Sequence, residues 1–266
     1  MSANVQPGEG RGVAVPSWRA LGWTGFYGGI LLSWIAVALM ARGQGAAGSV
    51  PAEFWAALCA SAADASLPAL WAMWALMAAA MMLPTFVPAL RTFTDLSATG
   101  ATTGAGAMAL VAGYGAVWLG ASALGAGAQA ALARAGVLTP FGASLSPWLT
   151  AALLVGAGFY QFSAIKAACL AKCRMPLTFF MEHWRPGAPA AFRMGLRLGA
   201  LCLGCCWALM ALGFVGGVMN LVWMGAATLF MVLEKLPDLG RHLTRPAGWA
   251  LIVAGGLVAL RAAGTV

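Results

Sequence analysis

The feature that most constrains the fold is a stretch of 36 residues, from Leu198 to Leu233, that contains no charged side chain. A transmembrane helix needs about 20 apolar residues, so this stretch is too long for one helix and fits two helices joined by a tight turn. Gly216-Gly217 marks the position of that turn. Such a hairpin belongs in a membrane, which agrees with a chain that is 62% hydrophobic and only 8% charged.

Other apolar runs predict further membrane spans, and together they predict an all-α bundle of about seven transmembrane helices. We expect residues 1–22 to form a tail, residues 23–266 to form the membrane domain, and residues 166–197 to form a long loop within it. The seven spans are expected at Trp23–Met40, Leu67–Leu90, Ala105–Leu132, Trp148–Ile165, Leu198–Val215, Val218–Leu233 and Ala247–Leu260.

The basic residues predict how the chain is oriented. Twelve Lys and Arg fall on one side of the seven spans, and three, Arg42, Arg134 and Arg261, fall on the other. Because basic loops stay on the cytoplasmic side of a membrane, we expect the N-terminal tail and the 166–197 loop in the cytoplasm and the protein in a bacterial inner membrane. The net charge of +8 is thereby explained by topology in a lipid bilayer, and nucleic acid is not expected as a partner.

Cysteines are the most informative residues for function. Cys202, Cys205 and Cys206 share one face of a predicted helix, and Cys169 and Cys173 lie one helical turn apart on the other side of the long loop. Thiolates select soft ions such as Cu(I), or Zn(II) where four of them converge. We therefore expect a transition-metal site, with copper favoured and zinc as the alternative, although a single buried cysteine more often serves only in packing.

Methionines supply a second set of soft ligands. Met73, Met77 and Met81 recur every four residues along one predicted span, and Met210 lies one turn beyond Cys206. Thioethers can bind Cu(I) without placing charge in the membrane. We expect Met77, Met81 and Met210 to assist a copper site, while packing is the usual role of such a stripe.

Two further residues are candidates for the site. Pro84 interrupts the second span and frees one backbone carbonyl, which predicts either a packing kink or a group that lines a cavity. His183, in the long loop near the cysteines, is a candidate ligand, although a solvated position is more common for a loop histidine. The same loop can form an interfacial helix with Phe179 and Phe180 dipping into lipid.

Short motifs run through residues 67–236. They are Ala80-Met81-Met82-Leu83-Pro84, Tyr160-Gln161, Lys166, Cys169, Cys173-Arg174, Gly204-Cys205-Cys206-Trp207, Met210, Met219-Asn220 and Glu234-Lys235. These motifs resemble a family of bacterial integral membrane proteins that are predicted to bind metal and are catalogued as a domain of unknown function. The resemblance implies a metal without fixing which one.

Four of the motif residues have expected roles around the thiols. Tyr160 and Trp207 would give the site an apolar, interfacial shell. Gln161 and Asn220 would hydrogen-bond across helices. The leading hypothesis is a membrane protein that binds Cu(I) for handling, delivery or transport, with no catalytic role and with a membrane or soluble protein partner; a homo-oligomer is equally compatible.

Two alternatives belong to other classes of protein. Cys202 with Cys205, or Cys169 with Cys173, could exchange electrons in a membrane thiol–disulfide redox protein, which requires a thiol of low pKa. The chain could also be a non-catalytic subunit of a larger membrane complex whose Cys and Met side chains only pack.

Overall fold

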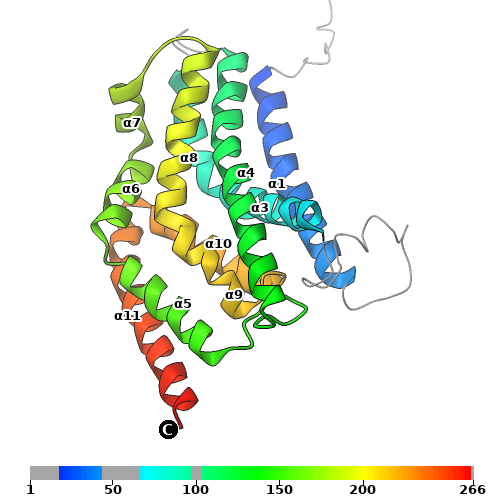
Figure 1. Ribbon diagram of the computed structural model, residues 1–266. Coiled ribbons are helices and arrows are strands. Elements are labelled where there is room, and N and C mark those ends of the chain that lie inside the picture. The colour runs from blue at the N-terminus through cyan, green and yellow to red at the C-terminus, as the bar shows by residue number, and fades with distance from the viewer. Residues whose placement is uncertain (1–17, 44–65, 97–102, 265–266) are drawn as a thin grey trace, which may run out of the picture.

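The computed structural model describes residues 18–43, 66–96 and 103–264, and these residues fold into helices with no strand among them (Figure 1). Most of the expected N-terminal tail lies outside the described residues. The helices are α1 (Trp18–Gly43), α3 (Leu67–Leu96), α4 (Gly104–Arg134), α5 (Pro147–Tyr160), α6 (Ala164–Arg174), α7 (Pro176–His183), α8 (Ala188–Ala211), α9 (Gly213–Gly216), α10 (Leu221–Lys235) and α11 (Pro237–Ala262).

Five membrane-spanning candidates stand out by length and apolar composition in the described part of the chain. They are α1, α3, α4, α8 continued by α9, and α11. A sixth is counted if α5 and α6, which meet at an angle of 63°, form one broken span. The all-α, multi-pass class predicted from the sequence is confirmed, whereas the count of seven is not, because α10 has only 15 residues and a span needs about 20.

The breaks between helices follow from local sequence. Ser163 caps α6, its hydroxyl accepting the backbone N–H of Lys166 at 3.1 Å, so the fourth predicted span ends at Tyr160 and a new helix begins at a different angle. Gly217 has φ +91°, a conformation that favours glycine, and it forms the turn between α9 and α10 that the sequence predicts.

The segment expected as a long loop, residues 166–197, is mostly helical. It forms α6, α7 and the first turns of α8. Phe179 and Phe180 are 1% and 0% exposed, and the ring of Phe180 lies 5.4 Å from that of Phe93 on α3. These two side chains therefore pack on the protein, and the expectation that they dip into lipid is wrong.

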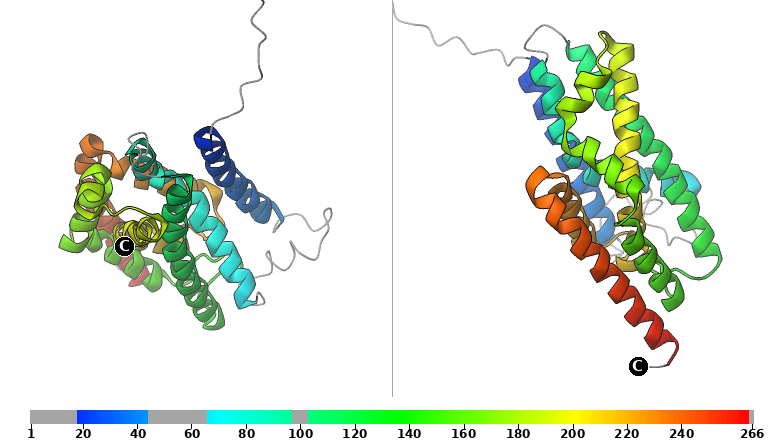
Figure 2. Two further views of the ribbon diagram at one scale, coloured as in Figure 1. Left: turned by 90° about the horizontal axis from the view of Figure 1, so that it is seen from above. Right: turned by 90° about the vertical axis from the view of Figure 1, so that its left-hand side faces the viewer.

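The two helices at the centre of the bundle, α4 and α8, lie with their backbones in contact. A side chain at Gly113 would meet the carbonyl oxygen of Phe192 at 2.2 Å, and one at Gly195 would meet the carbonyl oxygen of Leu110 at 2.2 Å. Glycine at both positions permits this approach. Helix α3 packs against α4, and α11 packs against α5 (Figure 2). The end of α10 comes to the junction of α6, α8 and α11, and this junction positions the site described next.

Candidate metal centre

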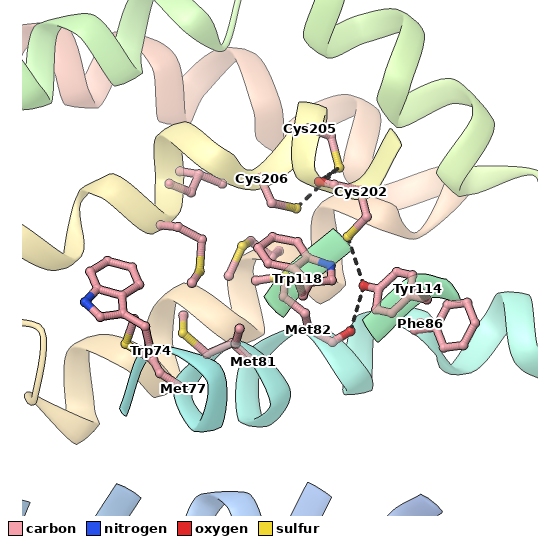
Figure 3. Close-up of a cluster of buried hydrophobic side chains, with 14 of the residues drawn as sticks. Trp74, Met77, Met81, Met82, Phe86, Tyr114, Trp118, Cys202, Cys205 and Cys206 are labelled. Carbon is pink, nitrogen blue, oxygen red and sulfur yellow. Dashed lines mark hydrogen bonds between the residues drawn. The ribbon is translucent and has the colours of Figure 1, made fainter. Parts of the chain in front are cut away.

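Three cysteine thiols meet on the inner face of α8, and they are called the thiol trio below. Cys202, Cys205 and Cys206 are 2%, 1% and 1% exposed. Their Sγ atoms all lie within 4.8 Å of one another, and those of Cys205 and Cys206 are 3.3 Å apart. In the described residues this is the one group of three or more His, Cys, Asp or Glu side chains close enough to share a metal ion. Figure 3 shows the trio facing α3 and α4.

Cys202 differs from the other two thiols because polar groups surround its sulfur. Lys235 donates to Cys202 Sγ at 3.0 Å, and the Tyr114 hydroxyl lies 3.1 Å from the same atom (Figure 3). Thr85 Oγ1 lies 3.8 Å from it and also accepts from Lys235 at 2.8 Å. The carbonyl oxygen of Met82 accepts from the Thr85 hydroxyl at 2.9 Å and lies 3.1 Å from the Tyr114 hydroxyl, whose one hydrogen is shared between this oxygen and the Cys202 sulfur. An ammonium and a phenol directed at one sulfur stabilise a thiolate there, since hydrogen bonds to ionised acceptors are the strong ones.

The buried ammonium of Lys235 has a sulfur atom as its partner instead of a carboxylate. Among the described residues no carboxylate lies within ion-pair distance of Lys235, although the side chain is in the buried core. The neighbouring Glu234 pairs instead with Lys166 at 2.8 Å, and both of these side chains are 1% exposed. Since buried charges are paired, the partner of the Lys235 ammonium is the sulfur of Cys202.

The two cysteines of α6 come to the same place. Cys173 shares with Cys202 and Lys235 the lining of a recess of about 20 Å³. The Cys169 sulfur lies 2.7 Å from the position that a side chain at Gly204 would take, so glycine leaves room for it. Both α6 thiols are half-buried, and they lie between the buried trio and the surface.

Methionines lie in the same core as the trio, but no hydrogen bond joins a methionine sulfur to the trio in the described part of the chain. Met77 and Met81 on α3 are buried in the same core cluster, farther along the helix from the thiols than Met82 (Figure 3). Met210 on α8 lines an apolar cavity of about 570 Å³. Their packing role is shown, and their role as ligands stays a prediction.

Aromatic residues at the end of α5 and on α8 support the trio from outside. The Tyr160 hydroxyl donates to the carbonyl oxygen of Gly204 at 2.5 Å, and its ring packs edge-on against Trp207 at 4.9 Å. Trp207 is 49% exposed, which matches an outward-facing shell residue. Gln161 is buried, but no partner for its amide is found in the described part of the chain, so the expected bond across helices is absent there.

The remaining candidates lie apart from the thiols or act differently. His183 contacts the carbonyl oxygen of Phe179 and stacks on its ring. Asn220 caps α10, where its side-chain oxygen accepts two backbone N–H groups. Its amide nitrogen donates to the carbonyl oxygen of Gly216, the last residue of α9, at 3.1 Å, so its side chain bonds across the turn between these two helices. Met219 is buried in the turn before α10. Pro84 lies within α3 next to Thr85, so the kinked part of α3 does line the site.

Three residues of the site were not predicted as such, namely Lys235, Tyr114 and Thr85. Lys235 was counted among the residues that set topology and stood in the Glu234-Lys235 motif of the family resemblance, which ends the long uncharged stretch, but it was given no role at the thiols. An ionisable residue at membrane depth is itself a signal of function. Tyr114 is one of three tyrosines in the chain and stands in a span made mainly of Gly and Ala. Thr85 carried no signal beyond its place beside Pro84.

The donor set fits a soft metal ion. With metal–sulfur bonds of about 2.3 Å, as for zinc, two thiolates on one ion lie about 4 to 4.6 Å apart in trigonal or linear geometry. The Sγ atoms of the trio, within 4.8 Å of one another, are in this range or closer. The donors are buried sulfur atoms, which favour Cu(I) or Zn(II) over hard cations.

Comparison with known proteins agrees with this chemistry. A family model described as a copper chaperone, PpoB2, matches residues 71–258. The matched region contains the thiol trio, both α6 cysteines and the polar groups around Cys202. No curated protein and no solved structure matches the chain.

Proposed function

Since this chain belongs to the PpoB2 family of copper chaperones, we propose that it binds Cu(I) at the thiol trio inside the membrane and hands it to a partner protein. The observation that carries the proposal is the buried set of three sulfur atoms within 4.8 Å of one another. Thiolate donors in a dry pocket suit a monovalent soft ion, and no reaction chemistry is needed to explain them.

Charge balance supports Cu(I) within this site. One Cu(I) with two thiolates carries a charge of −1, and the Lys235 ammonium beside Cys202 brings the whole site to neutrality. A neutral site is the least costly one at membrane depth. Zn(II) favours four ligands, so zinc would have to recruit Cys173 as a fourth thiolate together with the trio.

The membrane setting gives the direction of the proposal. Counted on the seven spans expected from the sequence, the split of twelve basic residues to three favours a cytoplasmic position for α6 and α7 in a bacterial inner membrane. Copper held here would be exchanged through Cys173 and Cys169, which lie between the trio and the surface. Met77, Met81 and Met210 would provide weaker thioether contacts along a path through the core.

The proposal is tested by measuring copper in the purified protein. The protein is prepared in detergent under reducing, oxygen-free conditions, loaded with Cu(I), and freed of excess metal. We expect about one copper per chain in the wild type and almost none in a variant with Cys202→Ser, Cys205→Ser and Cys206→Ser. The matched control is Cys59→Ser, the sixth cysteine, which should keep the copper.

Other outcomes would decide against the proposal. Copper retained by the triple variant would place the metal elsewhere. Copper absent from a folded wild type, with a Cys202–Cys205 or Cys169–Cys173 disulfide that forms reversibly with oxidant, would favour the thiol–disulfide redox function instead.

A further inference from the structure

The approach to the thiol trio is strongly basic. From Lys166 to Arg245, the segment that carries α6 to α10 and the start of α11, nine Lys and Arg face three acidic residues. Two of the three acids are already neutralised: Glu234 by Lys166, and Glu182 by Lys172. Lys235 is met by the sulfur of Cys202, so the six arginines of the segment remain against one acid, Asp238, in the first turn of α11.

Several of these cations lie close to the sulfur atoms. The Nε of Arg174 donates to the carbonyl oxygen of Glu234 at 3.0 Å, and its Nη2 lies 2.7 Å from the position that a side chain at Gly240 would take. Arg174 directly follows Cys173, and Arg241 lies on the exposed first turns of α11. The half-buried thiols of α6 thus stand among positive charges at the point where copper would have to arrive.

Positive charge at this point has opposite effects on two forms of copper. A free Cu(I) cation is repelled by it, whereas an anionic complex is attracted and its local concentration is raised. Copper(I) bound to two thiolates of an acidic thiol is such an anion. Its sulfur atoms are also ligands that the α6 cysteines can replace one at a time.

We propose that this basic approach selects copper that arrives as an anionic Cu(I)–thiolate complex of a small acidic thiol. This inference rests on the proposed function and names the form of its substrate. Arg241 and Arg174 attract the complex, Cys173 takes the first coordination position, and the buried trio takes the ion.

The transfer is a ligand exchange without oxidation or reduction. One sulfur–copper bond to the carrier breaks as each bond to a protein sulfur forms. A protein thiol that becomes a ligand gives its proton to the carrier thiolate that leaves. Cys202 is already a thiolate beside Lys235, so the carrier thiolate that it displaces takes its proton from water. Copper stays Cu(I) throughout, and the products are the loaded protein and the free, protonated carrier thiol.

The test compares two carriers of opposite charge. The full chain in nanodiscs of zwitterionic phosphatidylcholine is mixed with Cu(I) bound either to glutathione, whose complex is anionic, or to cysteamine, whose complex is cationic, at the same free Cu(I). Copper retained on the nanodiscs is measured over time. We expect transfer from glutathione to be about tenfold faster, and this preference to fall as salt is added.

Two variants on one helix give the matched comparison. Arg241→Gln, near the thiols, should reduce the preference for the glutathione complex about threefold, a change in the range of electrostatic steering. Arg261→Gln, at the far end of α11, should leave it unchanged. Both variants should bind the same final amount of copper.

The outcomes separate this inference from the proposed function. Equal transfer rates from both carriers, or an equal effect of Arg241→Gln and Arg261→Gln, would overturn the inference while the final copper content still reported on the thiol site. Loss of copper binding from every carrier would instead contradict the proposed function.

Discussion

Two buried lysines, Lys166 and Lys235, have similar surroundings and different partners. Lys166 forms an ion pair with Glu234 at 2.8 Å, with both side chains 1% exposed. Lys235, the next residue after Glu234, directs its ammonium at the sulfur of Cys202 at 3.0 Å. The carboxylate gives the first lysine a permanent anion, whereas the second lysine has an anion that can also bind metal. One pair therefore serves the fold, and the other serves the site.

The largest expected effect comes from breaking the first pair. Lys166→Met leaves the Glu234 carboxylate buried without its partner, and it should lower the free energy of unfolding by about 3–5 kcal/mol. Thermal or denaturant unfolding in detergent measures this change. The double variant Lys166→Met with Glu234→Gln should recover most of the loss, and a double variant as unstable as the single one would show that the pair does not act as a unit.

Breaking the second pair, Lys235 with Cys202, should change the affinity for copper more than the stability of the fold. Lys235→Met removes a charged hydrogen bond to Cys202, a contact worth about 1.5–3 kcal/mol, so Cu(I) affinity should fall about 10- to 100-fold. Competition with a chromogenic Cu(I) chelator measures this affinity. The folded Lys166→Met, Glu234→Gln variant is the matched control and should bind copper as the wild type does. An equal loss of Cu(I) affinity in both variants would contradict the claim that Lys235 serves the metal site and Lys166 serves the fold.

A smaller effect is expected from the phenol beside the same sulfur. Tyr114→Phe removes a hydroxyl that lies 3.1 Å from Cys202 Sγ, and the loss of one hydrogen bond of about 1 kcal/mol should weaken Cu(I) binding about fivefold. Tyr160→Phe is the control, because that hydroxyl donates to a backbone carbonyl. The same chelator competition should show unchanged affinity for it.

The smallest effect should come from the exposed ion pair of Lys172 with Glu182. The hydrogen bond from Lys172 lowers the pKa of Glu182 below its ordinary value. The pair therefore stabilises the fold above about pH 4.3, where the unfolded carboxyl is ionised, and the contribution is lost as pH falls through the lower pKa of the folded state. Glu182→Gln should shift the melting temperature only slightly at pH 7, and the shift should shrink as the pH falls below about 4.3. A shift as large as that of Lys166→Met would contradict the contrast between exposed and buried pairs.

Sequence patterns predict the part of the site that one helix carries. The spacing of Cys202, Cys205 and Cys206 fixes their common face because helical geometry is local. It could not show that Lys235 and Tyr114, 33 and 88 positions away, reach the same sulfur, since such meetings depend on how helices pack.

The fold was predictable to a similar extent. Apolar runs indicate helices and a membrane, and Gly217 sits at the predicted turn. The count of spans was not predictable, because α10 is as apolar as its neighbours and differs from them only in length. The packing of Phe180 was not predictable either, because an apolar face on a short helix can pack against protein or against lipid. In the structure the Phe180 ring packs against Phe93 on α3.

The backbone contact between α4 and α8 at Gly113 and Gly195 has a consequence for motion. Helices that touch through their backbones cannot slide or tilt without a clash, so the trio is held on the rigid side of the molecule. On the other side, α6 faces the trio through Cys169, whose sulfur rests against Gly204. The pocket should therefore open by displacement of α6, and hydrogen–deuterium exchange should slow on copper loading in α6 while remaining slow throughout in α8.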